Sequence, residues 1–178
     1  FQFHGRSYSV SDEHVFLSRR AVRPKEYRGC RFRRVAYPKA LQGAAESQFG
    51  VETVDRQGLD IRVASLERSL VDVLDRPDLG GGWEEIWRSA ESVEYYDSRQ
   101  VVDYVLLLRN ATTVAKVGFY LQQHREQLLL DDRQLARLKP ARPRQPHYME
   151  PGAPGHLVAD WNLIVPKTIL ARNWEAEP

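Results

Sequence analysis

Apolar residues recur at helical spacing through the middle of the chain. Leu70 and Leu74 fall on one face of a helix that begins after Ser65, whose hydroxyl can cap the helix. Pro77 and the three glycines at 80–82 end this helix. The same spacing predicts helices over residues 65–75, 83–94, 98–109 and 112–125. Because each helix has an apolar face to cover, the pattern predicts a helical bundle.

Alternating apolar and polar residues predict strands before the helical region. Two strands are expected over residues 14–18 and 30–37. A hairpin over 50–55 and 59–64 is closed by the turn at 56–58, which contains a glycine. We expect these strands to form one small antiparallel sheet.

The segment after the bundle contains shorter elements. We expect a short strand, a short helix, a proline-rich connection, a strand and a closing helix, over residues 128–130, 132–139, 140–146, 155–166 and 167–174. Trp161 and Trp174 are large apolar groups whose burial would hold this tail in place.

These elements define an α+β fold, with a small antiparallel sheet packed on a helical bundle and a C-terminal strand-helix element. Residues 1–64 are expected to be mainly β, 65–139 to form the bundle, and 140–178 to form the linker and closing element. The chain has 178 residues, 42% of them hydrophobic, which suits one compact domain.

Composition indicates the cellular compartment in which the protein is expected. No apolar run approaches the length needed to span a bilayer, and no segment has the pattern of a signal peptide. The single cysteine, Cys30, cannot form a disulfide within the chain. We therefore expect a cytoplasmic protein with no membrane association.

Charge is divided unevenly along the chain. Residues 1–40 hold ten basic and three acidic side chains, whereas residues 41–107 hold six basic and fourteen acidic ones. Such a division can steer a basic face toward nucleic acid or an acidic partner. The two regions can equally pair within the fold.

Arginines in the basic region are the candidate contacts to nucleic acid or to a partner protein. On a strand, Arg31 and Arg33 share one face opposite Phe32 and could contact neighbouring phosphates. The alternative is that the arginines cover a solvated sheet face and pair with the acidic helices. The candidates are Arg19, Arg20, Arg31, Arg33 and Arg34.

A search for catalytic constellations returns little. The five histidines are scattered and have no metal-ligand spacing, and Gly80-Gly81-Gly82 lacks the residues of a phosphate loop. Adjacent acids at 84–85 and at 131–132 fall at predicted helix starts, where negative charge favours the helix dipole. We expect a non-enzymatic protein with no metal or cofactor. A nuclease that uses Asp131 or Asp132 stays open as an alternative.

The segment from Ser65 to Asp72 carries the motif Ser-Leu-Glu-Arg-Ser-Leu-Val-Asp. Arg68 and Asp72 are four apart and can pair on one helix face, whereas Glu67 points elsewhere. We expect this pair to be structural, with a partner-facing contact as the alternative. Farther along, Asn110 or Thr112 can cap a helix, Gly118 permits close helix approach, and Lys116 is expected to be solvated or to face a partner.

The order of these motifs resembles the abortive-infection AbiEi family. The resemblance rests on the 65–72 motif, the glycine-rich turn, the paired helices and the helix that carries Val117-Gly118-Phe119-Tyr120, and it covers residues 15 to 125 best. It implies the antitoxin and transcriptional-regulator half of a toxin-antitoxin pair. It also implies a winged helix-turn-helix that binds promoter DNA, followed by a domain that neutralises a nucleotidyltransferase-like toxin.

We expect this chain to match the region after the DNA-reading domain, because strand-like sequence begins by about residue 14 and leaves no room for a three-helix reader. The expected partners are a cognate toxin and, through a domain outside this chain, promoter DNA. A DNA-associated regulatory domain without a toxin partner is the second hypothesis.

Overall fold

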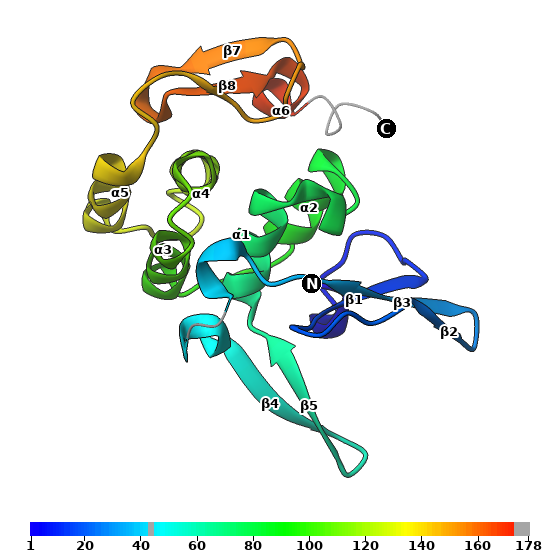
Figure 1. The fold of residues 1–178 in the computed structure, drawn as a ribbon. Helices are drawn as coiled ribbons and strands as arrows, with labels where there is room; N and C mark the ends of the chain where they lie inside the picture. The colour runs from blue at the N-terminus through cyan, green and yellow to red at the C-terminus, as the bar shows by residue number, and fades with distance from the viewer. Residues whose placement is uncertain (43–44, 173–178) are drawn as a thin grey trace.

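The computed structural model describes residues 1–42 and 45–172. Its centre is the predicted bundle of helices (Figure 1). The bundle helices are α1 (Leu66–Asp75), α2 (Trp83–Glu91), α3 (Ser98–Leu107), α4 (Ala111–Gln123) and α5 (Asp132–Leu138). Ser65 and Asn110 cap α1 and α4, since each side chain accepts a hydrogen bond from a backbone N–H in the first turn. The predicted helices are confirmed, with ends that differ by a few residues.

Helix α4 lies at the middle of the core. Every residue from Thr113 to Leu121 is buried, so neighbours cover the helix on all sides. Trp87 of α2, which is fully buried, packs edge-on against Tyr120 with ring centroids 5.5 Å apart. Burial of such large apolar groups is the main stabilising term for the fold, at about 1.5–3 kcal/mol per large side chain.

The strands of the described residues form three small sheets. The first contains β1 (Glu13–Leu17), β3 (Cys30–Val35) and β2 (Lys25–Tyr27) in that spatial order. The second is the hairpin of β4 (Val51–Arg56) and β5 (Leu59–Ala64). The third contains β6 (His147–Tyr148), β8 (Leu163–Pro166) and β7 (Gly155–Val158). The α+β class is confirmed, whereas the single antiparallel sheet is wrong.

The additional strand β2 explains part of this difference. It pairs with β3 through a tight turn at Arg28-Gly29, where both residues have positive φ. Because β2 occupies one edge of β3, β1 pairs with the other edge and runs parallel to β3. The predicted β4–β5 hairpin is confirmed and projects away from the helices (Figure 1).

The tail departs from the sequence prediction at two places. The predicted strand over 128–130 is a turn, in which Leu128 and Leu130 are buried and Leu129 is exposed with φ of 46°. The predicted strand over 155–166 is two strands separated by a short 3-10 helix, Ala159–Trp161, because Asn162 turns the chain with φ of 48°.

The closing helix α6 (Lys167–Ala171) follows β8. Trp161 is fully buried as expected, and Trp174 lies outside the described residues.

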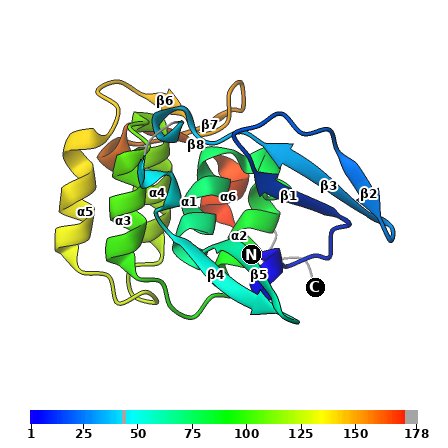
Figure 2. The ribbon, with the colours of Figure 1, turned by 60° about the horizontal axis from the view of Figure 1, so that its bottom comes forward.

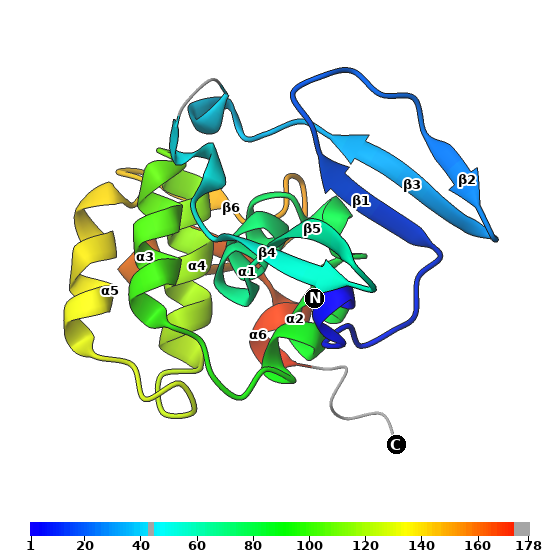
Figure 3. The same cartoon turned by 90° about the horizontal axis from the view of Figure 1, so that it is seen from below.

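Seen with the bottom of the molecule turned forward, the β1–β3–β2 sheet lies at the opposite end of the molecule from α5 (Figures 2 and 3). None of the helices that the structure describes is long and apolar enough to cross a bilayer.

Candidate functional site

Two of the motif residues form a buried polar network on α1. The Arg68 side chain is fully buried, and its Nη1 donates hydrogen bonds to the carbonyl oxygens of Ser47 at 2.8 Å and Phe49 at 2.7 Å. Its Nε lies 3.5 Å from the Asp72 carboxylate, which also accepts a hydrogen bond of 2.8 Å from the Tyr104 hydroxyl. The i, i+4 pair predicted from the sequence is present, and it also joins α1 to the segment that leads into β4.

Burial sets the electrostatics of this network. Desolvation raises the pKa of Asp72, while the guanidinium groups of Arg68 and Arg76 and the Tyr104 hydroxyl oppose that rise. Desolvation also raises the pKa of Tyr104, and the nearby Asp72 carboxylate adds to the effect. The Arg68 guanidinium lies 5.1 Å from the centre of the Tyr104 ring. These groups face the protein interior, where they hold segments of the fold together.

Other residues of the resemblance also make contacts within the fold. The Glu67 carboxylate accepts a hydrogen bond of 3.1 Å from the backbone N–H of Asp97, which precedes α3. Gly118 permits a close approach, as the sequence predicts: the ring of Trp161, the last residue of the 3-10 helix Ala159–Trp161, packs directly against it. Lys116 is placed differently from the prediction: it is only 7% exposed.

The arginines of β3 point toward a neighbouring strand. Arg33 Nε donates to the Glu13 carboxylate at 2.8 Å, and Arg31 Nε lies 3.9 Å from the same group. Parallel pairing of β1 with β3 places Glu13 opposite Arg31. Arg31 and Arg33 do share a face, but their ion-pair partner is on β1, and the expected pairing with the acidic helices is wrong for both.

The remaining candidates lie around the same sheet. Arg34 Nε donates to the carbonyl of Ser18 at 3.1 Å, and Arg19 Nη2 donates to the Ser47 hydroxyl at 2.9 Å. Arg20 is exposed just beyond β1. The structure therefore gathers Arg19, Arg20, Arg31, Arg33 and Arg34 around one sheet, and at least three of them also support its local geometry.

This sheet is open to solvent on both faces. No residue of β1, β2 or β3 is buried. Val15 and Phe16 are neighbours in β1 and point to opposite faces, yet they are 43% and 38% exposed, and Tyr27 of β2 is 62% exposed. Apolar and aromatic side chains thus stand among arginines on a surface that the helices leave uncovered.

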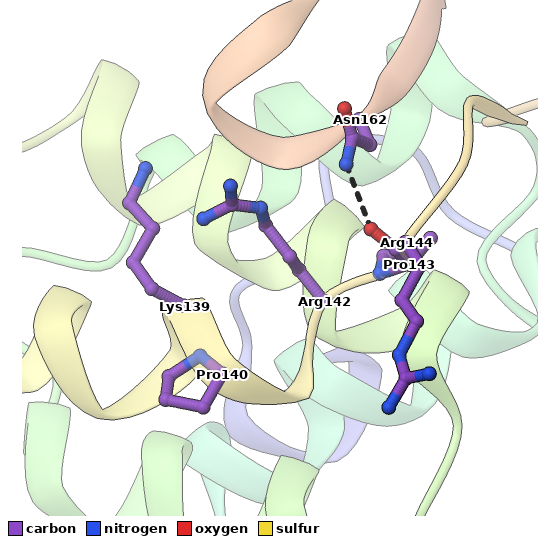
Figure 4. A pocket seen from close by; sticks show the side chains of 6 residues that line it. All are labelled: Lys139, Pro140, Arg142, Pro143, Arg144 and Asn162. Atoms are coloured by element: carbon purple, nitrogen blue, oxygen red, sulfur yellow. Dashed lines mark hydrogen bonds between the residues drawn. The ribbon is translucent and has the colours of Figure 1, made fainter.

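A second basic surface lies at the end of α5. A pocket of about 440 Å³ is lined by Lys139, Arg142, Arg144 and Asn162, with prolines between them. Lys139 and Arg142 extend to one side of the connection, whereas Arg144 points to the other (Figure 4). Lys139 Nζ lies 3.5 Å from the Asp160 carboxylate, so one acid offsets part of the charge. Sequence reasoning identified only a stiff connection here, because the pocket also depends on the later segment that carries Asn162.

The acids considered for catalysis have local partners. Asp131 caps α5 by accepting a hydrogen bond of 2.9 Å from the Arg133 N–H, and Asp132 pairs with Arg125 at 2.9 Å. Glu84 pairs with Arg88 at 3.0 Å. Across residues 1–42 and 45–172, no group of three or more His, Cys, Asp or Glu side chains is arranged to hold a metal ion.

Comparison with known proteins returns no family model, no curated protein and no solved structure that matches this chain. The likeness to the AbiEi family therefore stays a prediction that rests on the sequence motifs alone.

Proposed function

We propose that this chain is a non-enzymatic, antitoxin-like domain of a toxin-antitoxin transcriptional regulator, and that it neutralises a nucleotidyltransferase-like toxin by direct contact in the cytoplasm. Promoter DNA would be bound through a domain outside these residues. One observation carries the proposal: the β1–β3–β2 sheet exposes apolar, aromatic and arginine side chains on a surface that the helices leave uncovered.

The composition of this surface suits a protein partner. Tyrosine, phenylalanine and arginine are enriched in protein interfaces, and arginine and tyrosine are enriched among the residues that contribute most to binding. Phe16, Tyr27 and Arg31 combine these types on one small sheet. An acidic patch on the toxin would complement the arginines and speed the encounter.

The buried motif supports a division of roles. Arg68 and Asp72 belong to the sequence pattern that resembles the family, but they contact Ser47, Phe49 and Tyr104 inside the fold. We infer that they maintain the scaffold, whereas partner choice depends on exposed residues such as Arg31 and Tyr27.

Co-expression with the neighbouring toxin gene tests the proposal. The wild-type chain should restore growth and co-purify with the toxin. The variant R31E/R33E should fold but lose both activities. A charge-swapped variant, E13R/R31E/R33E, rebuilds the ion pairs within the sheet with opposite sign and controls for their loss.

If the arginines serve only Glu13, the swapped variant regains activity, and the proposed role of the basic surface is wrong. If the toxin binds the positive charges of Arg31 and Arg33, the swapped variant stays inactive. Failure of the folded wild-type chain to restore growth or to bind the toxin would contradict the proposed function itself.

A DNA-associated regulatory domain is the second candidate, because two basic surfaces are present: the sheet arginines and the group around Lys139, Arg142 and Arg144. Binding to phosphates releases counterions, so the affinity for duplex DNA would fall steeply with salt. Titration of duplex DNA at two salt concentrations checks this candidate, and weak binding with little salt dependence would exclude it.

A further inference from the structure

A separate pocket of about 440 Å³ lies between α4, the turn from α1 to α2 and the loop after β6. Its lining includes Lys116, the start of α2 at Gly82 and Trp83, and the acids Asp78 and Glu150. The volume falls within the range of small-molecule sites. None of these side chains takes part in the basic sheet or the Arg68 network.

Lys116 is the most informative residue in this pocket. It is 7% exposed, and its ammonium group lies 5.1 Å from the centre of the Trp83 ring. Within the described residues it has no hydrogen-bond acceptor and no ion pair. Burial lowers the pKa of Lys116, while the charges of Asp75 and Glu150 oppose that change. Because Lys116 lines the pocket and its ammonium group has no acceptor there, an anionic oxygen atom of a ligand could accept a hydrogen bond from it.

The N-terminus of α2 favours the same kind of ligand atom. Its N-cap residue is Gly82, which supplies no side-chain hydrogen bond to the first turn. The acids of that turn are directed elsewhere: Glu84 pairs with Arg88, and Glu85 accepts a hydrogen bond from the Ser9 N–H. Unsatisfied N–H groups at a helix N-terminus attract anionic oxygens. Two independent features of the pocket therefore favour an anionic group.

The rim of the pocket has the opposite charge. Asp78 and Glu150 are exposed, and within the described residues neither carboxylate has a hydrogen-bond or ion-pair partner. Asp75 is already engaged, since it accepts hydrogen bonds from the side chains of Asn110 and Thr113. A simple anion would be repelled by the two rim carboxylates, whereas a ligand that also carries cations would be attracted to them.

We propose that this pocket binds a free basic amino acid, with its carboxylate held by Lys116 and the N-terminus of α2 and its two cationic groups held by Asp78 and Glu150. Trp83 offers an aromatic wall for the aliphatic stem of the ligand. Three carboxylates line the pocket, and Asp75 is paired with Arg76 at 3.7 Å. The remaining groups match the ligand in charge: Lys116 and a helix N-terminus face one carboxylate, and Asp78 and Glu150 face two cations. The proposal does not depend on the antitoxin function.

Isothermal titration calorimetry of the full chain with L-arginine as the probe tests this site. Two matched probes test the two parts of the site. Agmatine lacks the carboxylate that Lys116 would bind, and L-citrulline lacks the guanidinium charge that the rim acids would bind. We expect arginine to bind at one site and each matched probe to bind at least about tenfold more weakly, a difference of about 1.4 kcal/mol.

Variants of the protein test the carboxylate-binding part and the cation-binding part of the site separately. K116M should reduce arginine affinity to that of agmatine and leave agmatine binding unchanged. D78N/E150Q changes only exposed rim residues and should reduce arginine affinity to that of citrulline. K167M, which changes an exposed lysine on α6, is the matched control and should bind arginine as the wild type does.

Three results would overturn the proposal: no saturable heat with arginine, equal binding of arginine and agmatine by the wild-type chain, or unchanged arginine affinity in D78N/E150Q. If K116M fails to fold, D78N/E150Q still tests the proposal, because it changes only exposed residues.

Discussion

The helical core and the β1–β3–β2 sheet use arginine in opposite ways. In the core, Arg68 is fully buried and donates to two backbone carbonyls beside the Asp72 carboxylate. In the sheet, the side chain of Arg31 is 55% exposed and lies 3.9 Å from Glu13. The spacing of two charged residues in a sequence can predict an ion pair. Its contribution to the free energy of unfolding depends on burial, which the spacing does not show. Burial makes the removal of one partner costly for the first pair, whereas exposure leaves the second pair available to a partner protein.

Replacement of Arg68 should give the largest effect. R68M removes the buried cation, leaves the carbonyls of Ser47 and Phe49 without their donor and leaves Asp72 with less compensation. We expect a loss of about 3–5 kcal/mol in the free energy of unfolding. Urea denaturation measures it, with R31M as the matched control. A loss below that of R31M would contradict the structural role of Arg68.

Replacement of Gly118 tests how closely the tail packs against the core. Alanine normally stabilises a helix interior by about 1 kcal/mol relative to glycine. Here a Cβ would collide with the Trp161 ring, which is fully buried and donates a hydrogen bond of 2.6 Å to Gln122. We expect G118A to destabilise the fold by about 1–3 kcal/mol through overpacking. Thermal unfolding checks this, and a more stable variant would show that Trp161 is free to move.

Alkaline pH should weaken the core. Burial raises the pKa values of Tyr96, Tyr104 and Tyr120. Since each folded-state pKa lies above the unfolded value of about 10, their contribution to stability is complete below that pH and is lost as the pH rises beyond it. Denaturation at a series of alkaline pH values measures the loss, and Y120F should reduce it. An identical pH profile for Y120F would contradict the prediction for that residue.

The sheet should show the smallest effect on stability. Both ion pairs of Glu13 are partly exposed, so we expect R31M and R33M each to change the free energy of unfolding by less than about 1 kcal/mol. Urea denaturation at low and high salt measures the change. A loss as large as that of R68M would remove the contrast between the two regions.

Much of the core could be predicted because its signals are local. Helical spacing identified the bundle, Ser65 identified one helix start, and the alternatives Asn110 and Thr112 placed another, which Asn110 caps. The turn at 56–58 identified the hairpin. Each of these features depends on neighbours in the sequence, so one sequence is enough to find them.

The missed features depend on distant segments. Strand β2 has only three residues and forms through pairing with β3. The three consecutive leucines at 128–130 suit a short strand, but they form a turn because only Leu128 and Leu130 reach the core. The partner of Arg31 depends on parallel pairing with β1. The pocket at Lys116 joins segments from α2, α4 and the loop after β6, and no local pattern identifies it.

Hydrogen–deuterium exchange of the chain alone and with its cognate toxin tests most directly whether the open sheet is the partner surface. Slower exchange on binding should be confined to the backbone N–H groups of β1, β2 and β3, with little change in the buried helix α4. Protection that falls on α3 and α5 instead, or no protection with a toxin that binds, would contradict the assignment of the sheet.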